Sequence, residues 1–211
     1  MKRHIFKSIF LVLVVLSPLT SHAQKKLEDF LNKCAYGTPA EVATALKAGA
    51  SPNATDKDGN TPLMYALENG NNPKVFKLLI KAGAPVKTKN SDGNNVLMEM
   101  AKVFFMGRGT STYDVVESAK LFLEAGCAID EVNKEGKTAL MLVAAHGDQS
   151  RLIFYLLRMN ADAKKKSKEG KTAFDYAKTN PTGFLKSTKT IPIYKENNID
   201  AYTALKNASN P

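Results

Sequence analysis

The chain has 211 residues, of which 44% are hydrophobic and 24% are charged. This length allows one domain or two small ones, and so ordinary a composition argues against a disordered chain or a coiled coil. There are 30 lysine and arginine residues against 20 aspartate and glutamate residues, which gives a formal net charge of +10 at pH 7.

The first 23 residues are typical of a cleavable secretory signal. Basic residues at positions 2, 3 and 7 precede an unbroken apolar run at 9–16, Pro18 interrupts the run, and Ala23 follows as a small residue where a signal peptidase cuts. The run is too short for a stable membrane span of about 20 residues. We therefore expect cleavage after Ala23 and export to the periplasm of a Gram-negative bacterium or out of the cell. An uncleaved N-terminal anchor is the alternative.

One sequence element recurs four times in the rest of the chain. It reads DGNTPLMYA from Asp58, DGNNVLMEMA from Asp92, EGKTALMLVA from Glu135 and EGKTAFDYA from Glu169. The glycines of successive copies are 34, 43 and 34 residues apart. Recurrence at such a period indicates a stacked repeat architecture.

A second element precedes each copy of the first. It reads ALKAGASPN from Ala45, LLIKAGAPV from Leu78, LFLEAGCAI from Leu121 and LLRMNADAK from Leu156. Its apolar residues follow the spacing of a helix, and the glycine in its first three copies is a natural helix terminator. This element therefore predicts the end of a helix and the turn that follows it.

The first element carries the signals of a helix start. Thr61, Thr138 and Thr172 can cap free backbone N–H groups, and Pro62 suits a first helical turn. Gly59 and its equivalents precede the cap in a tight turn, where a positive φ favours glycine. We expect a first helix of about nine residues in each unit.

Together the two elements resemble the ankyrin repeat, whose period is 33 residues and whose core reads T-P-L-H-x-A. The resemblance covers about residues 27–177 and implies an all-α solenoid of stacked helix-turn-helix units with projecting hairpin loops. After the expected signal at 1–23, the resemblance predicts repeat units at about 24–56, 57–90, 91–133 and 134–167 and a partial unit at 168–180. The segment at 181–211 matches no family pattern, and we expect it to cap the open end of the stack. Within that segment we expect a helix at about 199–207, with Asn198 as its cap.

The histidine of the family core is missing. Its position holds Met64, Met98, Met141 and Asp175. In ankyrin repeats this histidine helps to bridge neighbouring turns, so the hairpins are expected to be less rigid here. Neutral drift within a tolerant core is the alternative interpretation.

The spacing of 43 residues places nine extra residues in the third unit, around 104–114. An insertion that keeps the flanking register must loop out of the stack. Phe104, Phe105, Arg108 and Tyr113 make it a candidate binding loop, because exposed aromatic residues beside arginine are typical of binding hot spots. Alternatively, the two phenylalanines extend the first helix into the core and the rest is an inert loop.

The positive charge is concentrated in the C-terminal third. Residues 24–133 hold 13 basic and 13 acidic residues, whereas residues 134–211 hold 14 and 7. Five lysines are expected on one hairpin: Lys164, Lys165, Lys166, Lys168 and Lys171. They could attract an acidic protein, an anionic lipid or another polyanion, or they form a solvated tip. Nucleic acid is a poor candidate for an exported protein.

Catalytic chemistry has little support in the sequence. His146 is the only histidine after the predicted signal. One histidine and two cysteines cannot easily provide the three or four ligands of a zinc site, and a histidine-activated nucleophile would have to use His146. We expect no cofactor, no metal and no enzymatic activity. Cys34 and Cys127 are predicted to be free, mostly buried thiols, because two stacked units separate them and a disulfide needs Cα atoms within about 7 Å.

We therefore expect a monomeric protein-binding module without stable membrane insertion after signal cleavage. Its predicted binding face comprises hairpin tips and first helices: Lys57, Asp58, Asn60, Tyr65, Glu68, Asn69, Ser91, Asp92, Asn94, Glu99, Lys102, Lys134, Glu135, Lys137, Leu142, Ala145 and His146. The main alternative is a secreted effector or immunity-type protein that acts on a host or a rival cell. An enzyme with a cryptic site at His146 is a third and weaker hypothesis.

Overall fold

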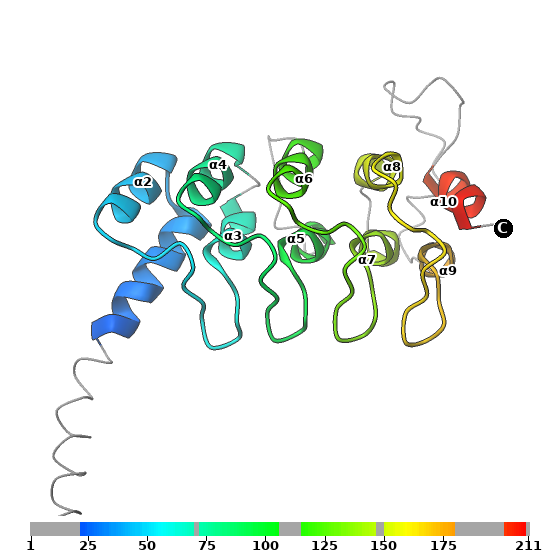
Figure 1. Ribbon diagram of the computed structural model, residues 1–211, viewed down its shortest axis with the longest axis horizontal. Helices are drawn as coiled ribbons and strands as arrows, with labels where there is room; N and C mark the ends of the chain where they lie inside the picture. Colours follow the sequence, from blue (N-terminus) through cyan, green and yellow to red (C-terminus); the bar gives the residue numbers. More distant parts are fainter. Residues whose placement is uncertain (1–21, 70–71, 106–114, 147–149, 180–200, 210–211) are drawn as a thin grey trace, which may run out of the picture.

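The computed structural model of this protein describes residues 22–69, 72–105, 115–146, 150–179 and 201–209. Every regular element within these ranges is a helix, and none of them contains a strand. The helices form a single row of pairs, and the hairpin loops that join one pair to the next project to the same side of the row (Figure 1). The predicted all-α solenoid is confirmed.

Each pair gives one helix to an inner layer, beside the projecting loops, and one to an outer layer (Figure 1). The inner layer holds the helix over residues 22–36, α3 (Pro62–Tyr65) with the 3-10 turn η1 (Ala66–Asn69), α5 (Val96–Phe105), α7 (Ala139–His146) and α9 (Ala173–Lys178). The outer layer holds α2 (Pro39–Lys47), α4 (Pro73–Lys81), α6 (Val115–Glu124) and α8 (Ser150–Arg158). Successive helices of each layer are in contact. Each pair therefore buries its apolar side against its neighbours, as stacked repeats must.

Polar side chains cap the inner helices, as predicted for the threonines. The hydroxyl of Thr61 accepts a hydrogen bond at 3.3 Å from the backbone N–H three residues later, and Thr138 and Thr172 do the same. In the third pair the side-chain oxygen of Asn95 takes this role at 3.1 Å. Each cap satisfies an N–H group that has no partner inside its helix.

Left-handed residues end the outer helices. The backbone φ is 92° at Gly83 and 94° at Gly126, as expected from the recurring Ala-Gly-Ala element. In the fourth pair Asn160 stands at the same point with a φ of 62°. Asparagine is one of the few non-glycine residues that often adopt the left-handed conformation. The outer helix of the fourth pair can therefore end at the equivalent position without a glycine.

The second inner helix differs from the expected nine-residue helix. It consists of four α-helical residues in α3 and four 3-10 residues in η1. The amide of Asn69, the last residue of η1, donates to the backbone oxygen of Gly37 at 2.7 Å and to that of Cys34 at 3.3 Å. These bonds tie the end of η1 to the preceding pair.

The apolar core runs along the row between the two layers. Phe76 of α4 and Phe122 of α6 are fully buried, and their ring centroids lie 4.9 Å apart in an edge-to-face arrangement. This geometry is a preferred one for aromatic pairs. The contact links the second pair to the third, so the core is continuous across the 43-residue unit.

The last helix, α10 (Ala201–Ser209), covers the C-terminal end of the row (Figure 1). It contacts α8 and α9, its Leu205 is fully buried, and the hydroxyl of Ser209 donates to the backbone oxygen of Ala163 at 3.2 Å. This confirms the expected capping helix, shifted two residues from its predicted bounds. The proposed cap Asn198 lies outside the described residues. Of the helices that the structure describes, none is long and apolar enough to cross a membrane.

Candidate functional site

Three hollows lie in series along the side formed by the inner helices and hairpins, and we call them the groove hollows. The first, of about 330 Å³, is lined by Gln24, Leu27, Glu28, Leu31, Asn32, Asp56, Lys57, Asp58 and Tyr65. The second, of about 170 Å³, is lined by Asn60, Met64, Tyr65, Glu68 and Glu99. The third, of about 260 Å³, is lined by Asp92, Asn94, Lys102, Asn133, Lys134, Glu135, Lys137 and Leu142. Each hollow spans a boundary between two repeats, so a ligand along the groove would touch several repeats at once.

One polar side chain shapes each hairpin tip. The side-chain oxygen of Asn90 accepts hydrogen bonds from the backbone N–H groups two and four residues later, at 3.1 and 3.0 Å. Asp56 and Asn133 make the same two bonds in their own hairpins, at 2.8 to 2.9 Å. In the last hairpin the hydroxyl of Ser167 accepts only the first of them, at 3.3 Å. The tips therefore share one rigid turn geometry, held from within.

Hydrogen bonds also join each hairpin to the next. The side-chain amide of Asn90 donates to Asn60, and that of Asn133 donates to Asn94, each at 2.9 Å. Backbone bonds run beside them. They are donated by Ser91 to Asp58 at 2.7 Å, by Lys134 to Asp92 at 3.0 Å and by Lys168 to Glu135 at 3.0 Å.

Asparagine side chains thus bridge the first three hairpins where the family uses a histidine. Met64, Met98 and Met141, which stand at the histidine position, are buried. The sequence interpretation missed Asn90 and Asn133 as structural residues. A signal was available, because Asp56, Asn90, Asn133 and Ser167 all stand three positions before the glycine of their tip.

The inner helices reach back to the same tip residues. The hydroxyl of Tyr65 donates to Asp56 at 2.9 Å, and the hydroxyl of Tyr176 donates to Ser167 at 3.0 Å. In the third unit the amide of Asn90 donates to Glu99 at 2.8 Å. These contacts help to fix the angle between these three hairpins and the helices that follow them.

The Asp56–Tyr65 pair is a charged hydrogen bond. Burial opposes ionisation of Asp56, but hydrogen bonds from Asn60, Tyr65 and Asp58 outweigh it and hold the pKa of this carboxyl below its usual value. Burial and the same bond raise the pKa of Tyr65 to about 12. Near neutral pH, Asp56 is therefore an anion and Tyr65 a neutral donor.

Most of the predicted binding residues lie at the protein surface, and all of these except Asn69, Ser91 and Ala145 line the groove hollows. The exposed ones are Lys57, Asp58, Ser91, Asp92, Lys134 and Glu135. Those that are half-buried are Asn60, Tyr65, Glu68, Asn69, Glu99, Lys102, Lys137 and Ala145. The exposed set forms the hairpin tips, so a partner would meet the tips first.

Two predicted binding residues are buried. Asn94 is 2% exposed and Leu142 is 4% exposed. Asn94 donates to Glu99 at 2.7 Å and accepts from Asn133, so its amide is used inside the protein. Both side chains form the floor of the third groove hollow, where they can shape a binding surface more than touch a partner.

The lysines of the third groove hollow are partly neutralised. Lys102 lies 3.1 Å from Asp92 and 3.3 Å from Glu99, and Lys137 lies 2.5 Å from Glu135. Burial opposes the charge of Lys102, but the two carboxylates outweigh it and raise its pKa. Lys134 has no carboxylate within ion-pair distance among the described residues, so it is the cation this hollow offers to a partner.

The lysine cluster of the last hairpin lies at the surface. Lys165 donates from its ammonium group to the backbone oxygen of Asp130 at 2.7 Å, and Lys171 pairs with Glu169 at 2.6 Å. The other members of the cluster are exposed and have no ion pair within the described part of the chain: Lys164, Lys166 and Lys168. The cluster thus keeps a local excess of positive charge.

Four other candidate residues and His146 lie at or beyond the ends of the described segments. Phe104 and Phe105 belong to the backbone of α5, and His146 ends α7, but their side chains are not described. Arg108 and Tyr113 lie outside the described residues. The described part contains no group of three or more His, Cys, Asp or Glu residues that could hold a metal ion.

Both cysteines are buried and free, as predicted. Cys34 lies in the helix over residues 22–36, and Cys127 follows α6. Burial raises the pKa of Cys34 to about 12 and that of Cys127 to about 11. Because the thiolate is the reactive form, neither residue is a candidate nucleophile near neutral pH.

Comparison with known proteins agrees with this architecture. The family pattern described as ankyrin repeats, in three copies, matches residues 31–103 and 110–206. Most of the chain is matched, so the protein belongs to the ankyrin-repeat family. Repeats of this family form protein-interaction modules.

Individual relatives match this chain over part of their own length. Ankyrin repeat domain-containing protein 63 of Homo sapiens is 34% identical over 106 residues, which cover 50% of this chain and 26% of that protein. Protein glp-1 of Caenorhabditis elegans is 27% identical over 195 residues, which cover 75% of this chain and 14% of that protein. Protein lin-12 of the same organism is 31% identical over 147 residues, which cover 65% of this chain and 10% of that protein. The chain therefore spans about a quarter or less of these relatives.

Proposed function

We propose that the protein is a non-enzymatic module that binds a protein partner along the groove hollows. The observation that carries this proposal is the continuous hydrogen-bonded frame beneath the exposed tips. Asn90 and Asn133 each hold their own turn and bind the hairpin before it. A surface fixed in this way loses little conformational freedom on binding, which favours affinity.

The charges along the groove suggest the kind of partner surface. The first two groove hollows are predominantly acidic, with Glu28, Asp56, Asp58, Glu68 and Glu99 against Lys57. The third mixes both signs. A partner with basic residues at the end that meets the first two hollows would match this pattern, because complementary charge steers association and sets orientation.

Affinity capture tests the proposal directly. The tagged protein is incubated with the periplasmic fraction of its native cells, and captured proteins are identified by mass spectrometry. A groove variant carries Lys57→Glu, Asp58→Lys and Lys134→Glu, three exposed side chains at hairpin tips. A control variant carries matched charge reversals in the outer layer: Lys74→Glu, Lys81→Glu and Glu124→Lys, which are also exposed.

We expect the groove variant to lose the partner and the control variant to retain it. Capture by both variants would contradict binding at the tips and would point to the insertion at 104–114. Loss of the partner by both variants would show that capture depends on the overall charge of the protein and not on the groove hollows. Circular dichroism of each variant establishes that the fold is intact.

We further propose that the mature protein starts after Ala23 and resides in the periplasm. The support is the order of basic residues, apolar run and small residues in the first 23 positions. Cell fractionation with mass spectrometry of the N-terminus checks both points. Recovery of the protein mainly from the culture medium would favour the secreted effector or immunity-type alternative instead.

A further inference from the structure

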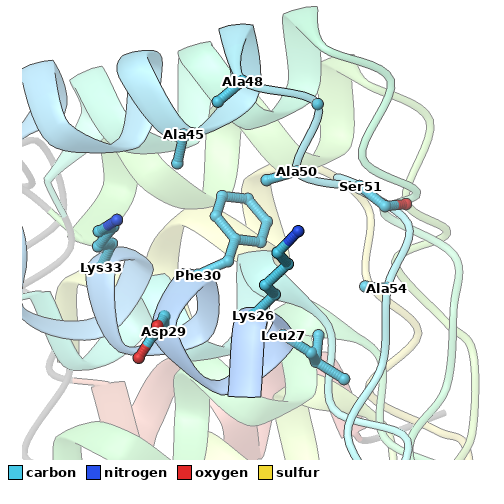
Figure 2. A pocket seen from close by; sticks show the side chains of 11 residues that line it. Lys26, Leu27, Asp29, Phe30, Lys33, Ala45, Ala48, Ala50, Ser51 and Ala54 are labelled. Atoms are coloured by element: carbon cyan, nitrogen blue, oxygen red, sulfur yellow. The ribbon is translucent and has the colours of Figure 1, made fainter. Parts of the chain in front are cut away.

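A separate hollow lies at the N-terminal end of the row, and we call it the end hollow. It has a volume of about 540 Å³ and lies between the helix over residues 22–36, α2 and the loop that follows α2 (Figure 2). This volume falls within the range of about 300–1,000 Å³ that is typical of small-molecule sites. None of the predicted partner-binding residues lines it.

The end hollow is lined by a small side chain at a position that is large in the later repeats. In the later repeats the position four residues before the left-handed turn holds Leu79, Phe122 and Leu156, each with 0% exposure. In the first repeat this position holds Ala45, which is half-buried and lines the end hollow. The side chain that fills this place elsewhere in the row is thus reduced to a methyl group, and within the described residues the pair that carries it stands at the end of the row (Figure 1).

The walls of the end hollow are apolar. The buried ring of Phe30 lies in the middle of the lining residues, and the methyl groups of Ala45 and Ala50 point toward it (Figure 2). Ala48 and Ala54 line the same space, and Leu27 lies beside it. Such a surface favours an aliphatic chain, because moving each methylene group from water into an apolar site lowers the free energy.

Two cations flank the apolar walls. Lys26 and Lys33 are seven residues apart on one helix, hence on the same face, and they lie on either side of the Phe30 ring (Figure 2). The carboxylate of Asp29, which also lines the end hollow, points away from the ring in this view.

One further acidic group is near. Glu41 lies close enough to Lys33 for their charges to interact. Its carboxylate, however, accepts hydrogen bonds from the backbone N–H and the hydroxyl of Thr38, at 2.7 and 2.8 Å. Glu41 is therefore held by the start of α2, and the ammonium group of Lys33 remains available to a ligand.

We propose that the end hollow binds a small single-chain amphiphilic anion, with its aliphatic chain in the space left at Ala45 and its carboxylate between Lys26 and Lys33. The apolar walls select the chain and the two ammonium groups select the sign of the head group. This site is independent of protein binding along the groove hollows.

Isothermal titration calorimetry with three probes of equal chain length tests the choice of ligand. The probes are decanoate, decanol and decyltrimethylammonium. The two ions are used below their micelle concentrations and decanol below its solubility limit. We expect decanoate to bind in a saturable manner, decanol to bind about two- to fivefold more weakly, which is the range that exposed ion pairs contribute, and the cation to bind least. Equal binding of all three probes, or no saturable binding of decanoate, would overturn the proposal.

Variants test the position of the site. Ala45→Leu restores the side chain that the later repeats carry, so decanoate binding should fall at least about tenfold. Thr44→Leu adds the same side chain at the neighbouring exposed position, outside the end hollow, and should leave binding unchanged. Lys26→Gln and Lys33→Gln should each weaken decanoate binding about two- to fivefold without affecting decanol.

The lysine variants keep the test decisive if Ala45→Leu disturbs the fold, because both lysines are exposed. Unchanged decanoate binding in the Lys26→Gln, Lys33→Gln double variant would show that the end hollow does not select anions. Unchanged binding in a folded Ala45→Leu variant would show that the chain lies elsewhere. The groove charge-reversal variant should bind decanoate normally, which separates this site from the proposed protein partner.

Discussion

Asn133 donates a hydrogen bond from its side-chain amide to the side-chain oxygen of Asn94, 2.9 Å away in the preceding hairpin. Both residues are buried. The oxygen of the same Asn133 amide accepts from the backbone N–H groups of Glu135 and Lys137, each at 2.9 Å. One side chain therefore shapes its own hairpin and sets its position against the hairpin before it.

We predict that Asn133→Ala lowers the free energy of unfolding by about 2–3 kcal/mol. The change leaves two backbone N–H groups and the Asn94 oxygen without their partner, and each unpaired buried polar group costs about 1–3 kcal/mol before the site relaxes. Urea denaturation followed by circular dichroism measures the loss. Lys134→Ala, at the adjacent exposed position, should stay within about 0.5 kcal/mol of the parent protein.

A double-mutant cycle isolates the bond between the hairpins. Asn94→Ala and Asn133→Ala should be non-additive, with an interaction free energy of about 0.5–3 kcal/mol, which is usual for residues in direct contact. If the two effects instead add to within experimental error, the amide pair contributes nothing beyond the two separate turns.

Alanine substitutions at two glycines distinguish the cost of backbone strain from the cost of a steric clash. Gly93 and Gly83 have positive φ values of 78° and 92°. A Cβ at Gly93 would lie 2.8 Å from the backbone nitrogen of Lys134, whereas a Cβ at Gly83 would have nothing within 4 Å. We predict that Gly83→Ala costs about 1–2 kcal/mol, the usual penalty for this conformation, and that Gly93→Ala costs at least about 1 kcal/mol more.

Thermal or urea unfolding of the two alanine variants gives this comparison. Equal losses would mean that the hairpins can separate by a few tenths of an ångström at no cost. Such a result would argue that the hydrogen bond from Lys134 to Asp92 does not hold the hairpins together.

Signals that act within one repeat could be predicted from the sequence. Thr61 caps the helix that begins at the next residue by accepting from the N–H three residues later, and the left-handed turn at Gly83 depends only on its own backbone. Even Asn160, which replaces a glycine, is found by its place in the recurring element. The local order of these signals determines the helix-turn-helix unit, and repetition then determines the solenoid. The boundaries between units stay a prediction.

Features that depend on two repeats at once could not be predicted. The bond from Asn133 to Asn94 requires the distance between neighbouring hairpins, which no single repeat encodes. The burial of Leu142 follows from packing of α7 among α5, α8 and α9. The end hollow was missed for a related reason. A single alanine such as Ala45 does not indicate a hollow, and it stands out only when it is compared with the large side chains at the equivalent positions of the later repeats.

The buried thiols should make stability fall on the alkaline side. The ordinary pKa of a thiol is 9.0, and burial raises it to about 12 at Cys34 and about 11 at Cys127. The unfolded chain therefore releases these protons first, so the stabilising contribution is complete below pH 9 and is lost as pH rises toward 11 to 12. Between pH 8 and 10 we expect a loss of about 1 kcal/mol per thiol.

Urea denaturation at pH 8, 9 and 10 checks this slope, with a Cys34→Ala, Cys127→Ala variant as the control. The variant should show a shallower decline over the same interval, whatever its absolute stability. Parallel slopes would show that the thiols do not carry the effect. In the folded parent protein at pH 8, both thiols should also react far more slowly with a thiol reagent than they do in urea.

The carboxyl of Asp175 should remain ionised to unusually low pH. It accepts hydrogen bonds from the backbone N–H of Thr172 at 3.0 Å, from the Thr172 hydroxyl at 2.8 Å and from Lys178 at 2.9 Å. The backbone bond foremost, then Lys178 and the hydroxyl, lower its pKa from 3.8 to about 2. Because the folded value is the lower one, the contribution to stability is present above pH 3.8 and is lost as pH falls toward 2.

An NMR titration of the Asp175 carboxyl carbon measures this pKa in the folded protein. Thr172→Val removes the hydroxyl but keeps the backbone N–H, so the pKa should rise only part of the way toward 3.8; Lys178→Gln should likewise raise it in part. A titration midpoint near 3.8 in the parent protein would contradict the hydrogen bonds that Thr172 and Lys178 donate to this carboxyl. Because α9 supports the terminal helix α10, exchange of the α10 amides should quicken as this carboxyl is protonated, before the rest of the row opens.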